Sequence, residues 1–175
     1  MPRKIIVYIA TSADGYIARP NGDFAWLNRA PVKGNYGMAK FYKKVDTVIM
    51  GRKTYEAGVK LGQKGYPGMR NYVFSGSPKK SDVPHVEYVN EDIDGFAKRL
   101  RRAKGKHIWL VGGSGIIASF LDQRQIDEFI IHVIPLFIGA GIPLIQPAHR
   151  SVPLTLLKAR RYSDGVVRLR YRVKR

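Results

Sequence analysis

The chain has 175 residues and is 45% hydrophobic, which suits one domain, residues 1–175, around a single core. It has no cysteine and only four scattered histidines, which exclude disulfides and thiolate zinc sites and argue against any metal centre. No hydrophobic run reaches the ~20 residues of a membrane span and the first residues do not resemble a secretion signal. The cytoplasm is therefore the expected compartment, and the net charge of +18 favours an anionic partner such as nucleic acid or a phosphorylated metabolite.

Apolar runs of strand length alternate with helical patterns along the chain, which is typical of an α/β protein with a parallel sheet. Strands are predicted at residues 5–10, 47–50, 72–74, 86–89, 107–111 and 129–134. Helices are predicted at residues 23–30, 39–44, 92–103 and 114–122, with a further short helix after Gly51.

The last part of the chain has a different pattern. Residues 154–162 and 166–174 flank Ser163-Asp164-Gly165, a turn sequence typical of a β-hairpin. The second arm alternates apolar residues with cations, which indicates a half-buried antiparallel strand. The whole sequence predicts a mostly parallel central sheet with an antiparallel hairpin added at the end.

A predicted strand runs into glycines at residues 107–115. It ends in Val111, and Gly112 and Gly113 then lead into a helix that starts at Ser114-Gly115. Glycines let a phosphate approach the backbone closely, and the free N–H groups at the helix start can bind it. The same residues would equally suit a tight turn without a ligand, and they do not match the Gly-x-Gly-x-x-Gly pattern of Rossmann folds.

A second predicted strand ends in Gly51 and is followed by a short helix. Arg52 and Lys53 supply positive charge there, and the hydroxyl of Thr54 can donate to a phosphate oxygen. By itself the segment would also suit a capped surface helix. Two such turns after parallel strands fit the two phosphate regions of a dinucleotide better than either turn does alone.

Acidic residues after the first strand are candidates for proton chemistry. Asp14-Gly15 predicts a turn, and Asp23 is followed by Phe24 and Trp26. One hypothesis is that Asp23 orients or protonates a heterocyclic substrate, because apolar neighbours would favour its neutral form near neutral pH. The alternative is that Asp23 only opposes the dipole at a helix start.

In their order along the chain, these segments resemble the dihydrofolate reductase superfamily. The matching segments are Asp14-Gly15-Tyr16-Ile17-Ala18, Val48-Ile49-Met50-Gly51-Arg52-Lys53-Thr54-Tyr55-Glu56, Phe74-Ser75 and Gly112-Gly113. The resemblance is closest to the C-terminal reductase domain of riboflavin-pathway deaminase–reductases, through residues 126–128, 135–144 and 162–167. It covers essentially the whole chain and implies a three-layer α/β/α fold, NADPH as the cofactor and a homodimer.

The resemblance also implies roles for particular residues. Phosphates of the cofactor would lie at Gly51, Arg52, Lys53 and Thr54, its adenosine 2′-phosphate at Phe74 and Ser75, and its pyrophosphate at Val111, Gly112, Gly113, Ser114, Gly115 and Ile116. The nicotinamide would contact Ala10 and Ile17, and Asp23 would be the catalytic carboxylate. The substrate would be bound by Tyr8, Trp26, Leu27 and Tyr55.

Two departures argue against dihydrofolate itself as the substrate. The loop between Ile17 and Asp23 is shorter than the mobile loop of true dihydrofolate reductases. Ile131 stands where those enzymes place a threonine that hydrogen-bonds the carboxylate. The zinc deaminase that is often fused to riboflavin-pathway reductases needs cysteines, so a bifunctional enzyme is not expected.

The leading prediction is an NADPH-dependent reductase that transfers a hydride to a small heterocycle or sugar phosphate, of the 5-amino-6-(5-phosphoribosylamino)uracil reductase type. Dihydrofolate reduction is one alternative, and a pseudo-reductase that binds nucleotide without turnover is another. A third alternative, from a different class, is a nucleic-acid-binding protein that uses the face formed by Arg168, Arg170, Arg172 and Lys174. No aromatic side chain is interleaved among these cations on that face, as base stacking would need, since Tyr171 belongs to the opposite face of the strand.

Overall fold

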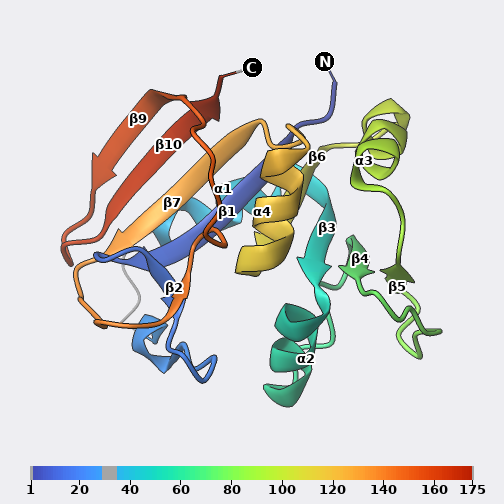
Figure 1. Ribbon diagram of the computed structural model, residues 1–175, viewed down its shortest axis with the longest axis horizontal. Coiled ribbons are helices and arrows are strands. Elements are labelled where there is room, and N and C mark those ends of the chain that lie inside the picture. The colour runs from blue at the N-terminus through green and yellow to red at the C-terminus, as the bar shows by residue number, and fades with distance from the viewer. Residues whose placement is uncertain (1, 29–34, 175) are drawn as a thin grey trace.

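The computed structural model of the protein describes residues 2–28 and 35–174. Its centre is an eight-stranded sheet in the order β5-β4-β3-β6-β1-β7-β10-β9 (Figure 1). The strands are β1 Ile5–Ser12, β3 Val45–Gly51, β4 Arg70–Phe74, β5 Val86–Val89, β6 His107–Gly112, β7 Glu128–Ile134, β9 Leu154–Arg161 and β10 Val167–Val173. Neighbouring strands from β5 to β7 run parallel, and β10 and β9 join antiparallel at one edge. This confirms the mostly parallel sheet with a C-terminal hairpin.

Helices cover both faces of the sheet, which confirms the three-layer arrangement. On one face, α3 (Ile93–Arg102) and α4 (Ser114–Asp122) pack their apolar side chains on the strands. On the other face lie α1 (Met38–Tyr42) and α2 (Arg52–Lys60), which contribute Phe41 and Tyr55 to a second core cluster. Within the described residues, no helix has the length and hydrophobicity required to traverse a lipid bilayer.

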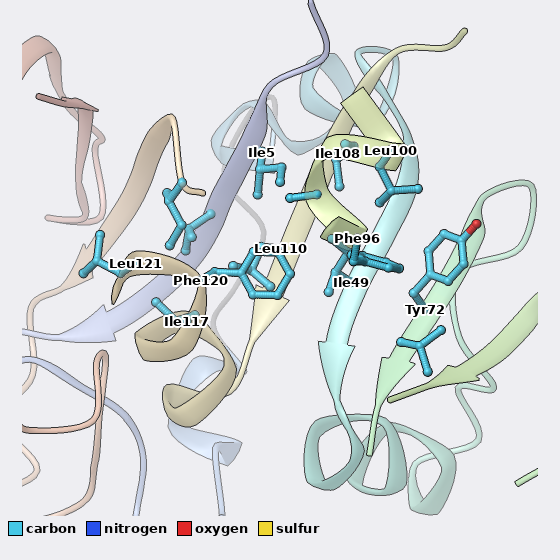
Figure 2. Close-up of a cluster of buried hydrophobic side chains, with 14 of the residues drawn as sticks. Ile5, Ile49, Tyr72, Phe96, Leu100, Ile108, Leu110, Ile117, Phe120 and Leu121 are labelled. Atoms are coloured by element: carbon cyan, nitrogen blue, oxygen red, sulfur yellow. The ribbon is translucent and has the colours of Figure 1, made fainter. Parts of the chain in front are cut away.

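The larger core cluster lies on the face of the sheet that α3 and α4 cover. Figure 2 shows Phe96 and Leu100 of α3 and Phe120 of α4 directed onto Ile108 and Leu110 of β6. Each of these side chains is at most 3% exposed. Burial of such a side chain contributes roughly 1.5–3 kcal/mol, so this face carries much of the stability that holds the strand ends in place.

The predicted helix at residues 23–30 is wrong over its described part. Only a 3-10 turn, η1 (Ala25–Leu27), forms there, and residues 29 and 30 lie outside the described residues. The Asp23 carboxylate accepts a hydrogen bond from the Ala25 N–H at 3.1 Å, while the N–H groups of Leu27 and Asn28 donate to carbonyls three residues back. Such local side-chain bonding competes with an α-helical ladder.

A second, two-stranded sheet lies beside the first, and the sequence pattern does not predict it. It pairs β2 (Tyr16–Ala18) with β8 (Ile142–Pro143). The Asp14 carboxylate supports the pairing because it accepts hydrogen bonds from the N–H groups of Ile138 and Gly139. The loop after β7 is thereby fixed against the turn after β1. A further 3-10 turn, η2 (Asn35–Gly37), precedes α1.

Candidate functional site

Two helices begin side by side at the carboxyl ends of the adjacent strands β3 and β6. Helix α2 starts after Gly51 and α4 after Gly113, and neither helix start has a side-chain cap. The two starts are close, because a Cβ atom on Gly113 would stand only 3.2 Å from Thr54 Oγ1. Uncapped N–H groups at two neighbouring helix starts form a site for anionic oxygens.

Ser114, at the start of α4, adds a hydroxyl with no internal partner. Its side chain is 5% exposed, and its Oγ makes no hydrogen bond within the described part of the chain. A buried hydroxyl without a partner costs about 1–3 kcal/mol, so the group is suited to a ligand that supplies one. Gly112, just before the turn, has φ +130°, which favours glycine, and the Gly112–Gly113 peptide bond is cis.

A pocket of about 320 Å³ extends from this region along the ends of β4 and β5. It is lined by Gly51, Phe74, Ser75, Gly76, Asn90, Glu91, Ile93, Ile116 and Ser119. The pocket therefore brings together four of the residues expected at the cofactor: Gly51, Phe74, Ser75 and Ile116. It is of a size to receive part of a nucleotide.

The charged residues expected at the phosphates lie at the surface. Arg52 and Lys53 occupy the first turn of α2 and both are exposed. Arg52 Nε lies 3.8 Å from Glu56 Oε1, one helical turn later, and the two side chains are 51% and 49% exposed. An exposed pair of this kind is weak, so Arg52 is available to an incoming phosphate.

The residues expected at the nicotinamide end lie across the sheet from α4. Ala10 packs with Trp26 and Leu27 against a small cluster of Ile134, Tyr162 and Val166. The indole Nε1 of Trp26 is buried and makes no hydrogen bond within the described residues. Ile17 lies in β2 and is partly buried. Ala10, Trp26 and Leu27 thus share one apolar cluster.

Two of the four residues expected at the substrate are buried in the protein. Tyr8 is 6% exposed and its ring stacks on Phe41 with a centroid distance of 4.4 Å. Burial raises the pKa of Tyr8. Tyr55 is 7% exposed and meets Tyr88 of β5 edge to face at 5.8 Å. Tyr8 therefore packs against α1 in the second core cluster, and Tyr55 lies toward the β5 edge of the sheet.

Asp23 does not have the apolar surroundings that its expected role assumes. Its side chain is 44% exposed, and its Oδ2 lies 3.7 Å from Arg19 Nε. The expectation of apolar burial is wrong, because the 3-10 turn leaves Asp23 outside the cluster of Trp26 and Leu27. The catalytic role of Asp23 stays a prediction.

A cluster of polar side chains around the Tyr36 carbonyl oxygen could not be foreseen from the sequence. The Tyr36 carbonyl oxygen lies close to four side-chain atoms: Tyr162 Oη at 2.9 Å, Arg168 Nη1 at 3.2 Å, Tyr8 Oη at 3.3 Å and His132 Nε2 at 3.4 Å. His132 is 4% exposed, and burial lowers the pKa of His132 to about 4, so its ring is neutral near pH 7.

On β7, the side chain that faces Tyr8 is that of His132. Ile131 packs on the opposite face, against the core cluster that contains α4. His132 Nε2 lies 3.3 Å from Tyr8 Oη. Strict alternation along β7 would have indicated this, since His132 shares its face with Glu128 and Ile130. Within the described residues no group of three potential ligands could hold a metal ion.

The geometry defines an α/β protein with two adjacent uncapped helix starts at the carboxyl edge of a mostly parallel sheet. The chain belongs to the family of RibD C-terminal domains, whose model matches residues 3–168. It is 40% identical over 168 residues to the YwjB protein of Bacillus subtilis strain 168, covering 95% of this chain and 96% of that protein.

Solved structures show the same fold. A Shewanella sp. PV-4 protein assigned to riboflavin biosynthesis matches with a TM-score of 0.86 and 28% identity, over 100% of both chains. A Thermotoga maritima deaminase and 5-amino-6-(5-phosphoribosylamino)uracil reductase matches at 0.74 and 18% identity, over 99% of this chain and 57% of that one. Enterococcus faecalis dihydrofolate reductase matches at 0.72 and 13% identity, over 98% and 97%. The fold is dihydrofolate reductase-like.

Proposed function

We propose that the protein is an NADPH-dependent reductase that acts on a ribosylated pyrimidine of the riboflavin-pathway type. The observation that carries the proposal is the pair of adjacent uncapped helix starts, α2 and α4, with the unpartnered hydroxyl of Ser114 at the start of α4. Membership of the RibD C-terminal domain family supports the reductase class and the pathway.

The residues present fit a nicotinamide dinucleotide, which supplies the hydride when it is bound. The N–H groups at the two helix starts and the Ser114 hydroxyl would hold its phosphates. Backbone at Ala10 and Ile17 would orient the nicotinamide. Trp26 and Leu27 would exclude water from the reacting carbons, because they pack on the same apolar cluster as Ala10. Asp23, whose side chain is open to solvent, would supply the proton that the substrate takes up together with the hydride.

NADPH is proposed over NADH because of the cations at the start of α2. Arg52 and Lys53 are exposed beside Gly51, which lines the pocket. The Enterococcus faecalis dihydrofolate reductase of the same fold was solved with NADP(H). We expect Arg52→Ala to weaken NADPH binding by about 1–3 kcal/mol, the cost of losing a charge-assisted hydrogen bond, and NADH binding by less. Titration by protein fluorescence measures both affinities.

The deciding experiment follows NADPH absorbance in the presence of different oxidants. The expected result is oxidation of NADPH with a ribosylamino-pyrimidine phosphate and little or none with dihydrofolate. Turnover of dihydrofolate alone would replace the proposed substrate and keep the enzyme class. Binding of NADPH without turnover of either compound would favour a nucleotide-binding protein that lacks catalysis. Failure to bind NADPH or NADH would reject the proposal.

A further inference from the structure

The pocket beside Gly51 has an unexpected charge for a site that is to receive an adenosine 2′-phosphate. Its lining, taken over the described residues, contains one ionisable side chain, that of Glu91, and no cation. Ser75 is also occupied: its Oγ donates to the Ser77 carbonyl at 3.1 Å and accepts from the Ser77 N–H at 3.2 Å. The hydroxyl expected to receive the 2′-phosphate is therefore engaged in a local turn.

The Glu91 carboxylate is held in a defined position. It follows the end of β5 and precedes Asp92, the N-cap of α3. Its Oε1 accepts a hydrogen bond from Arg99 Nη2 at 2.6 Å, and the Arg99 guanidinium carbon lies 5.1 Å from the centre of the Phe96 ring. The side chain is 42% exposed, so its Oε2 can accept a hydrogen bond from a ligand in the pocket.

A carboxylate at this place acts oppositely on the two nicotinamide cofactors. It can accept a hydrogen bond from a free ribose 2′-hydroxyl, the contact by which many NAD-binding sites recognise their cofactor. It repels a 2′-phosphate, which carries like charge. Arg52, the cation that would compensate, does not line the pocket and lies 3.8 Å from Glu56.

We propose that Glu91 is a specificity-determining residue: it contacts the adenosine ribose and reduces the preference for NADPH, so that the enzyme also uses NADH. This inference rests on the proposed function, because it requires the cofactor's adenosine to lie in the pocket. Arg52 favours NADPH and Glu91 opposes it, so the preference of the wild-type protein for NADPH is smaller than the Arg52 contact alone would give.

The test compares dissociation constants of NADPH and NADH for the wild-type protein and two charge variants. Glu91→Gln should tighten NADPH about five- to tenfold and weaken NADH a few-fold, because it removes the repulsion and the best acceptor. Arg99→Gln should have the opposite effect on NADPH, since it leaves the Glu91 charge without its partner. The gain in Glu91→Gln should shrink in high salt, because the group is partly exposed.

Glu87→Gln is the matched control, since Glu87 is exposed on β5 and does not line the pocket. It should change neither affinity, and thermal unfolding checks that all variants fold. If the wild-type protein binds both cofactors and Glu91→Gln leaves their ratio unchanged, the role of Glu91 is overturned and the proposed function stands. If the wild-type protein binds neither cofactor, both are overturned.

Discussion

Asp23 is the residue at which the sequence resemblance and the geometry differ most. The resemblance implies a catalytic carboxylate, yet the side chain is 44% exposed and lies near Arg19. We expect Asp23→Asn to lower kcat by roughly 100-fold, the usual contribution of a positioned acid or base. The loss should be smallest at low pH, where solvent can supply the proton.

A pH profile of kcat with a saturating substrate measures this effect. Arg19→Gln is the control, because it removes the ion pair and keeps the carboxylate. Should Asp23→Asn retain full activity across the pH range while binding the cofactor normally, Asp23 serves only the local turn at Ala25.

His132 makes the stability of the protein sensitive to acid. Burial lowers the pKa of His132 to about 4, against an ordinary value of 6.5. Between these values the unfolded chain binds a proton that the folded protein does not, so the free energy of unfolding falls as the pH falls from 6.5 to 4. The difference corresponds to roughly 3 kcal/mol.

Chemical denaturation of the wild-type protein and His132→Gln, each at pH 7 and pH 4, measures this contribution. The wild-type protein should lose roughly 3 kcal/mol more than the variant. Acid-sensitive groups such as Glu128 are present in both proteins and cancel in the comparison. Equal losses would show that His132 is not held neutral by the fold.

At the scale of residues, the side-chain contacts of the Tyr36 carbonyl oxygen could not be predicted from the sequence. A backbone carbonyl has no signature in the sequence, and this one depends on a left-handed backbone at Tyr36, with φ 52°. Its neighbours Tyr8, His132 and Arg168 come from three different strands. Only the sheet order brings them together.

At the scale of elements, the turn between β6 and α4 carries the cofactor prediction. Gly113 has φ −76°, which any residue can adopt, so a side chain there need not disturb the backbone. Its Cβ, however, would stand 3.2 Å from Thr54 Oγ1, in the space between the two helix starts. We expect Gly113→Val to abolish NADPH binding while the protein still folds.

Circular dichroism and thermal unfolding check the fold of this variant, and fluorescence titration measures its NADPH affinity. A folded Gly113→Val protein with unchanged affinity would show that the glycine turn has only a structural role. An unfolded variant would be replaced by Gly113→Ala, whose single methyl group needs Thr54 to shift by only a few tenths of an ångström.

Whether a helix or strand can be predicted from the sequence depends on its length and on the periodicity of its apolar residues. The strands of the large sheet carry apolar runs or strict alternation, so each of them can be predicted from the sequence. The strands β2 and β8 have three and two residues, which is too short for any period. The acidic residue Asp23 predicts a helix start, but its carboxylate bonds the nearby Ala25 N–H, and only a 3-10 turn without a side-chain cap follows.

The basic face of β10 is also partly explained at this scale. Arg170 pairs with the buried Glu128 at 2.6 Å, and Arg168 donates to the Tyr36 carbonyl at 3.2 Å. These two cations serve internal contacts, whereas Arg172 and Lys174 are exposed. No observation on this face favours a nucleic-acid site.

At the scale of the whole molecule, we expect a homodimer formed through β9. This strand ends the sheet order, and its Leu154 and Leu156 are 40% and 53% exposed. Lys158 and Arg160 lie on the same strand, so two copies repel and the dimer should be tighter at higher salt. Sedimentation analysis over a range of concentrations and salt measures the association.

Leu156→Lys should shift the protein toward the monomer by adding charge and removing apolar area from the edge. A mass that stays at 19.7 kDa under all conditions would reject the dimer. Dimerisation unaffected by Leu156→Lys would place the interface elsewhere on the molecule.

The position of β1 between β6 and β7 has a consequence for the synthesis of the chain. Both neighbours lie about a hundred residues further on, at His107–Gly112 and Glu128–Ile134. On the ribosome, the apolar strand β1 is therefore made long before either partner can pair with it. Pairing between strands that are far apart in the sequence slows folding and leaves hydrophobic surface exposed in the nascent polypeptide. A chain whose translation stops before β7 keeps one side of its most buried strand open to aggregation.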